Sequence, residues 1–203
     1  MKKIFIAVWT GALLLVLAGC GLLAPSSSMA PSTSSIAPSA DGLIHVIIPA
    51  DLLGGQSAQE AASNANDPSV KDLWTEFIAN KDGSVTWIVN QQQYETLREN
   101  TFNYGHVENL SGMENSSIIN TVYHDNMMKD ITIYVNKQKY NQSASDRMAA
   151  NQYCVIYAGE FQMLCGVAPD DWHVTITVED DKTHAVISKK DFPNDTMYDA
   201  GAY

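Results

Sequence analysis

The stretch RMAANQYCVIYAGEFQMLC, residues 147–165, is the longest helical pattern in this chain of 203 residues. Apolar residues recur along it at helical spacing, with no charge inside the stripe: Ala150, Cys154, Tyr157, Ala158, Phe161 and Cys165. Gly166 follows directly and is placed to end the helix. The pattern predicts a core helix that lies against a β-sheet.

Runs rich in β-branched and aromatic residues lie on both sides of this helix and predict strands. They cover residues 43–48, 73–79, 84–89, 118–123, 130–135, 173–178 and 184–188. Shorter helices are expected over residues 56–64, 91–98 and 137–140. The pair Asp82-Gly83 between two β-rich runs predicts a hairpin. We therefore expect an α+β fold, in which a mainly antiparallel sheet of six or seven strands carries helices on one face.

Two of these segments resemble each other. VTWIVNQQQY, residues 85–94, aligns with ITIYVNKQKY, residues 131–140, and five of the ten positions are identical at an offset of 46. Upstream, Thr75 matches Thr121, Phe77 matches Tyr123 and Asn80 matches Asn126 at the same offset. The shared unit is a hairpin, an Asn cap and a helix. An internal ββα duplication within one sheet explains the match, and so does convergence, since strands and caps both restrict residue choice.

The N-terminus has the pattern of an export signal. Lys2 and Lys3 precede an apolar run of about 15 residues, which is shorter than the roughly 20 needed for a membrane span. The run ends in Leu17-Ala18-Gly19-Cys20, which resembles the lipobox of bacterial lipoproteins. That resemblance implies cleavage before Cys20 and lipid attachment to its thiol. A signal anchor with an incidental cysteine is the alternative.

The sequence divides into three regions. Residues 1–19 are expected to be the signal peptide, residues 20–41 a lipidated and Ser/Pro/Ala-rich tether, and residues 42–203 a single α+β domain. Residues 21–41 contain seven Ser and three Pro, too few apolar groups to fold, and reach about 25 Å as a flexible chain. The expected location is the cell membrane, with the domain on the extracytoplasmic side.

The charge balance excludes some partners. The chain has 12 basic and 23 acidic residues, and removal of Lys2 and Lys3 with the signal would leave 10 against 23, a formal charge of −13. Nucleic acid and anionic bilayers attract clustered cations, so neither is an expected partner of the domain. The acidity is interpreted as a device for solubility.

Cys154 and Cys165 are the cysteines of the predicted domain, and a cysteine pair in an exported protein suggests a disulfide. On one continuous helix, however, eleven residues separate their Cα atoms by roughly 16 Å, whereas a disulfide needs about 7 Å or less. We expect both to be buried as small apolar residues, unless the chain breaks near Gly159.

Several motifs together resemble a family of small surface lipoproteins of Gram-positive bacteria that has no assigned activity. They are the lipobox, the strand end Ile48-Pro49-Ala50, the hairpin Asp82-Gly83-Ser84-Val85-Thr86 and the turn Pro169-Asp170-Asp171 before His173-Val174-Thr175-Ile176. The resemblance covers roughly residues 43 to 192. It implies a location and a fold pattern, and it brings no catalytic residues.

The motifs that mark catalysis in a sequence do not appear. The five histidines, His45, His106, His124, His173 and His184, form no zinc-binding pattern, and no serine elbow or phosphate loop is present. A catalytic triad dispersed along the chain stays open. Glu179-Asp180-Asp181 and Asp170-Asp171 are interpreted as solvated turns rather than weak calcium sites.

Aromatic residues are frequent in the predicted strands, and they are either core or an exposed platform for a glycan or peptide. They are Trp74, Trp87, Trp172, Tyr94, Tyr104, Tyr123, Tyr134 and Tyr140. Trp87 and Tyr134 occupy non-equivalent positions in the two similar segments and should face opposite sides.

The sequence thus predicts a membrane-anchored lipoprotein whose domain binds an unidentified protein or glycan. An extracytoplasmic hydrolase with a dispersed site and a structural envelope protein are the alternatives. Cys20, as lipid attachment site, is the assigned functional residue, and no catalytic, cofactor-binding or metal-binding residue is assigned.

Overall fold

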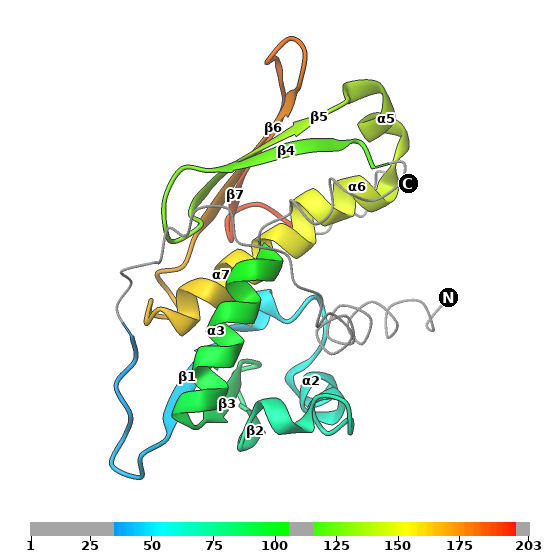
Figure 1. Ribbon diagram of the computed structural model, residues 1–203. Helices are drawn as coiled ribbons and strands as arrows, with labels where there is room; N and C mark the ends of the chain where they lie inside the picture. Colours follow the sequence, from blue (N-terminus) through cyan, green and yellow to red (C-terminus); the bar gives the residue numbers. More distant parts are fainter. Residues whose placement is uncertain (1–34, 106–115, 198–203) are drawn as a thin grey trace.

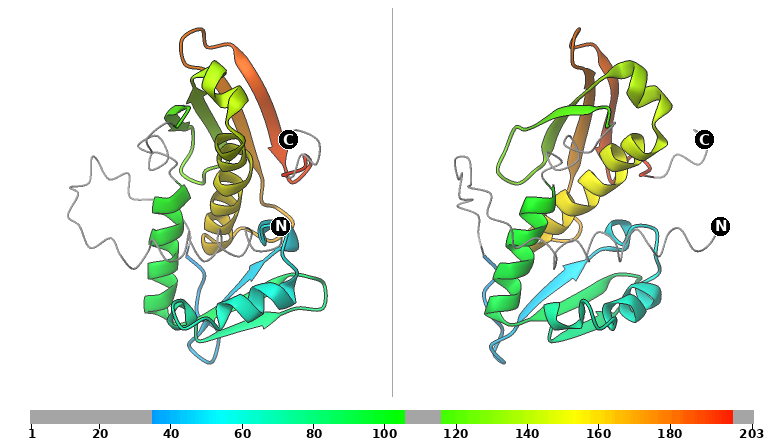
Figure 2. Two further views of the ribbon diagram at one scale, coloured as in Figure 1. Left: turned by 90° about the vertical axis from the view of Figure 1, so that its right-hand side faces the viewer. Right: turned by 45° about the vertical axis from the view of Figure 1, so that its right-hand side comes forward.

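A computed structural model describes residues 35–105 and 116–197 of the chain, with the side chains of residues 104 and 105 left out. Within them the fold is α+β and has two sheets, one of three strands and one of four. Figures 1 and 2 show three helices in the space between the two sheets: α3 (Gln91–Gly105), α6 (Ala144–Met148) and α7 (Cys154–Leu164). Buried side chains from both sheets and from α3 and α7 form one hydrophobic core.

The smaller sheet has the strand order β1-β3-β2, with β1 at Ile44–Ile48, β2 at Glu76–Ala79 and β3 at Val85–Val89. Both pairings are antiparallel, and Val46, Trp87 and Phe77 lie opposite one another. The β2–β3 hairpin turns at Gly83, whose φ of 90° is left-handed, so the Asp-Gly prediction is confirmed. Helix α2, Ala58–Ala65, packs on β2 and β3.

The larger sheet has the order β4-β5-β6-β7, with strands at Ile118–Tyr123, Asp130–Val135, Val174–Asp180 and Val186–Phe192. Its outer pairs are antiparallel, and β5 and β6 are parallel. Parallel neighbours require a long crossover. Here α5 (Lys137–Gln142) and the helical run that follows it provide that crossover.

The expectation of one sheet with six or seven strands was wrong. The described residues contain seven strands, and they divide between two sheets. The expected helix over residues 147–165 is the reason, because in its α7 part every residue except Tyr157 is buried, rather than one stripe alone. It contacts β1 in the smaller sheet and β6 in the larger one, so each sheet packs on a different side of it (Figure 1).

This helical run begins at α6 (Ala144–Met148), passes through a π-helical segment, η3 (Ala149–Tyr153), and continues as α7 (Cys154–Leu164). All α7 residues except Tyr157 are buried. At its end the Gly166 N–H donates to the Met163 carbonyl and the Val167 N–H donates to the Gln162 carbonyl. With φ of 82° at Gly166, this is a Schellman cap, as the sequence predicted.

Gly159 lets a neighbouring element approach α7 closely. A Cβ atom built on Gly159 would lie 2.5 Å from Cδ2 of Leu52, in the short helix η1 (Ala50–Leu52), and Leu52 is fully buried. Helix α7 is unbroken at Gly159, and Cys154 and Cys165 are both buried and not joined in a disulfide. The cysteine prediction is therefore confirmed.

Polar contacts fix two neighbours to α7. The phenol of Tyr94, in helix α3 (Gln91–Gly105), donates to the carbonyl of Leu164 at the end of α7. The buried Gln162 amide donates to the His173 carbonyl at 2.9 Å and accepts from the His173 N–H at 3.2 Å. These contacts hold α3 and the start of β6 against the helix.

The two similar segments form hairpins followed by helices, but in different sheets. Asn90 and Asn136 cap α3 and α5 by accepting from the N–H groups of Gln93 and Lys139, and Tyr94 and Tyr140 are buried at matching positions. The upstream matches are not equivalent in space, because Phe77 pairs with Trp87 whereas Tyr123 pairs with Ile131. The β4–β5 hairpin has a loop two residues longer than that of the β2–β3 hairpin. The register of β4 on β5 is therefore shifted by two residues relative to that of β2 on β3.

The chain segment before β1 already contacts the domain. Ile36, which the sequence places in the tether, is half-buried against the core, and its N–H donates to the Tyr94 phenol oxygen at 3.3 Å. Residues 1–19 and most of the tether, Cys20 included, lie outside the described residues.

The raised pKa of the buried Glu160 carboxyl leads to a prediction of how the free energy of unfolding changes with pH. Burial in α7 raises the pKa of its carboxyl from 4.5 to about 8, so the folded protein binds this proton more tightly than the unfolded chain. As pH rises from about 4.5 to about 8, this group should lower the free energy of unfolding by on the order of 4 kcal/mol. Denaturant titrations of Glu160→Gln should show a flatter pH profile and greater stability at pH 8. Glu99→Gln, on the exposed surface of α3, should keep the wild-type slope, and an equal slope in Glu160→Gln would contradict the prediction.

Candidate functional site

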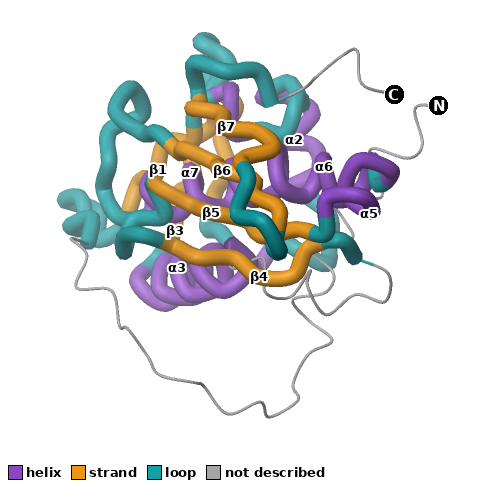
Figure 3. The backbone as a smooth tube through the Cα atoms, turned by 90° about the horizontal axis from the view of Figure 1, so that it is seen from above, coloured by secondary structure: helices purple, strands orange, loops and turns teal. Residues whose placement is uncertain are grey.

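One face of the four-stranded sheet carries none of the described helices. Side chains alternate along each strand, and Ile131, Ile133 and Val135 of β5 point into the core. Figure 3, seen from above, shows β4 to β7 laid over α7, with this outer face toward the viewer. The outer face is therefore a regular surface that the described helices leave open.

A row of side chains crosses this outer face at the end where β5 stops. The pairing register places Asn120 opposite Tyr134, Tyr134 opposite Glu179 and Glu179 opposite Val186. Ile119 lies at an irregularity of the β4 register beside Asn120. Ile119 and Val186 are 50% and 60% exposed, so the row has an exposed aliphatic side chain at each end. We call this row, with Ile119 and His184, the Tyr134 patch.

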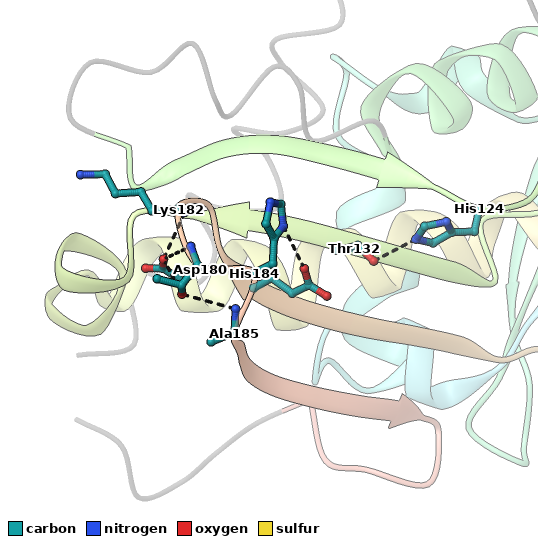
Figure 4. Close-up of polar contacts among 8 residues, drawn as sticks. His124, Thr132, Asp180, Lys182, His184 and Ala185 are labelled. Carbon is teal, nitrogen blue, oxygen red and sulfur yellow. Dashed lines mark hydrogen bonds and ion pairs between the residues drawn. The ribbon is translucent and has the colours of Figure 1, made fainter.

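The turn between β6 and β7 is held by Asp180. Its carboxylate accepts from the N–H groups of Lys182 and Thr183 and from the Thr183 hydroxyl, at 2.9–3.1 Å (Figure 4). Backbone bonds join Asp180 to His184 and Ala185. The Thr183 hydrogen bonds lower the pKa of the Asp180 carboxyl, because they stabilise its charged form. The turn is thus a rigid support for His184.

His184 has a left-handed backbone with φ of 55°, a conformation that costs a residue with a side chain about 1–2 kcal/mol. The conformation places its ring edge-on to Tyr134, with 5.5 Å between ring centroids and 83° between planes. Its Nδ1 lies 3.6 Å from a carboxylate oxygen of Glu179. The imidazole is 69% exposed and the carboxylate 20%, so the pair faces solvent.

The opposite end of the same sheet holds a second histidine. Nε2 of His124 lies 2.9 Å from the Thr132 hydroxyl. Figure 4 shows His124 and His184 well apart, at the two ends of the sheet. They therefore do not act on one bound atom.

The other residues that the sequence singled out lie elsewhere. His45 is on the outer face of the smaller sheet, 3.6 Å from Asp41, and His173 is exposed just before β6, where a strand was expected. His106 and Cys20 lie outside the described residues. The three tryptophans Trp74, Trp87 and Trp172 are buried and belong to the core. Tyr134 is half-buried on the outer face of the four-stranded sheet, whereas Trp87 belongs to the smaller sheet, so the expectation that the two face opposite sides of one sheet does not apply.

The acidic clusters are parts of turns. The Asp180 carboxylate accepts hydrogen bonds within the β6–β7 turn, and the Asp171 N–H donates to the Ala168 carbonyl in the turn before β6. No group of three or more His, Cys, Asp or Glu suited to a metal ion occurs within the described residues. Burial raises the pKa of the Cys154 thiol to about 12, so this sulfur stays protonated and unreactive.

Sequence reasoning did not bring Tyr134, Glu179 and His184 together. They lie in three segments that become neighbours through the parallel β5–β6 pairing and the β6–β7 turn. The parallel pairing has no local signal in the sequence. The Asp180-Asp181-Lys182 turn was recognised, but the left-handed residue after it was not.

His184 also gives a prediction about stability. His184→Gly removes the backbone strain and should leave the free energy of unfolding unchanged or higher, whereas the β-branched His184→Val should lower it by about 1–2 kcal/mol. Lys182 lies in the same turn without a positive φ, so glycine there should have no advantage over valine. Thermal unfolding of the four variants gives the order. Equal stability of His184→Gly and His184→Val would show that the left-handed conformation is not required.

Comparisons with protein-family models, with curated proteins and with solved structures gave no match to this chain. Within the described residues, no helix combines the length and apolar character needed to cross a membrane.

Proposed function

We propose that this protein is a lipoprotein, anchored by lipid on Cys20 at the extracytoplasmic side of the cell membrane, that binds a ligand without catalysis through the Tyr134 patch. The observation that carries the binding proposal is the open outer face of the four-stranded sheet. There an exposed histidine in a strained conformation is held against a tyrosine and a carboxylate. Residues kept in costly conformations cluster at functional sites.

The patch has the composition of a binding surface. A tyrosine, an imidazole and an amide stand between two exposed aliphatic residues, Ile119 and Val186. A rigid turn positions the imidazole in advance, which reduces the entropy lost when a ligand binds. The patch contains no serine or cysteine, and the adjacent Thr183 hydroxyl donates to Asp180. Hydrolysis through a serine, cysteine or threonine nucleophile is therefore disfavoured at the patch.

The proposed anchor rests on the residues around Cys20. The basic start, the short apolar run and the small residues before the cysteine are the features that a lipoprotein peptidase requires. Two or more acyl chains give stable membrane attachment at about 0.8 kcal/mol per buried methylene. The part of the Ser/Pro-rich segment that precedes Ile36, residues 21–35, would hold the domain roughly 20 Å from the anchor.

Lipid attachment is tested by growing expressing cells with an alkyne-labelled fatty acid. The wild-type chain should carry label and sediment with membranes. Cys20→Ser should lose both label and processing, whereas Cys154→Ser should keep them. Label on Cys20→Ser, or an unlabelled and uncleaved wild-type chain, would contradict the anchor.

Binding through the patch is tested by photo-crosslinking in the same cells. A benzophenone amino acid at Val186 should capture envelope material after irradiation. The matched control carries it at Ile47, an aliphatic residue 46% exposed on the outer face of the smaller sheet. The proposal expects adducts at position 186 that are absent at position 47. Equal adducts at both positions, or none at 186, would refute it.

A further inference from the structure

The Tyr134 patch belongs to a sheet face, and this decides how it can recognise a ligand. The backbone groups of β5 and β6 are used in ladders with their neighbours on both sides. A bound strand would add to an exposed edge, where main-chain N–H and C=O groups are free. Recognition on this face must therefore use side chains alone, which disfavours an extended peptide as the ligand.

The side chains of the patch row and of the row next to it can both donate and accept hydrogen bonds, and together they carry little net charge. Asn120 presents an amide and Tyr134 a phenol, and either group can donate as well as accept. The next row across the sheet holds Thr132 opposite Thr177, and Thr177 opposite Lys189. Glu179 in the patch row and Lys189 in the second row carry opposite charges. The row beyond these two holds Asp130 and Asp191 on either side of Thr175, so the face as a whole is acidic and repels an anionic ligand.

Apolar and polar groups alternate within the patch. Ile119 and Val186 are exposed at the two ends of the row, with Tyr134 between them, and the amide, carboxylate and imidazole lie beside these apolar groups. A sugar ring has the complementary pattern, with C–H groups on its faces and hydroxyl groups around its rim. Tyrosine suits such a partner, because it has a large apolar body and a polar tip.

The geometry points to a neutral glycan chain as the ligand of the Tyr134 patch. This inference rests on the proposed binding function and names the ligand class. His184 and Asn120 would hydrogen-bond hydroxyl or acetamido groups, Glu179 would orient the imidazole, and Tyr134 with Val186 would contact the C–H faces. The fixed turn at Asp180 would keep His184 in place before the sugar arrives.

The test titrates the full chain, purified in detergent, with two soluble neutral probes, chitohexaose and cellohexaose, by calorimetry. At least one hexasaccharide should bind, and Tyr134→Ala and His184→Ala should each weaken binding about tenfold or more. The matched control is His45→Ala, which removes a histidine likewise placed 3.6 Å from a carboxylate, but on the smaller sheet. It should bind as the wild-type chain does. A single cooperative thermal transition, above the titration temperature, in all three variants shows that they are folded.

Three results would overturn the inference. They are no heat with either probe, binding that Tyr134→Ala leaves unchanged, and equal weakening by His45→Ala. The crosslinks at Val186 separate this failure from that of the proposed function. Protein adducts at position 186 without glycan binding would replace the glycan by a protein ligand and leave the binding module intact. The absence of adducts would remove both.

Discussion

The fold depends on the burial of α7, in which every residue except Tyr157 is buried. A helix that is apolar on all sides cannot lie on the surface of one sheet, because its outer side would remain in water. Two sheets and α3 enclose it, and Gly159 lets Leu52 approach closely enough to fill the space on one side. Each buried Leu or Ile at this junction contributes roughly 1.5–3 kcal/mol, so the whole core is organised around this helix.

The same burial determines where the polar groups of the domain can be. Gln162 and Glu160 lie on sides of α7 that the sequence pattern would assign to solvent, and both are buried. Gln162 is satisfied by the backbone of His173 and so ties the helix to the start of β6. Burial of Glu160 disfavours the charged form of its carboxyl group and so raises the pKa of that group. Buried polar groups of this kind need specific partners, which makes the arrangement of helix and sheet unique rather than merely compact.

The candidate site follows from the crossover that α7 completes. By carrying the chain from the end of β5 back to the start of β6, the helices make these two strands parallel neighbours, and Glu179 comes to lie opposite Tyr134. The turn after β6 then adds His184. The helices occupy the inner face of this sheet, so the outer face with its polar rows is left to solvent (Figure 2). The helical crossover from β5 to β6 therefore both fills the core and leaves the outer face of the sheet open.

The sequence by itself determined the local structure: the positions of all seven strands within a few residues, the Asn caps, the Asp-Gly hairpin, the glycine that ends α7 and the burial of both cysteines. These features follow from backbone preferences and hydrogen bonds between residues close in the chain. Only the tertiary structure decided that the strands form two sheets, that β5 and β6 are parallel and that Tyr134, Glu179 and His184 meet. The division into two sheets and the parallel pairing depend on which elements cover α7. An apolar helix pattern shows that residues will be buried, but it does not show which residues they will contact.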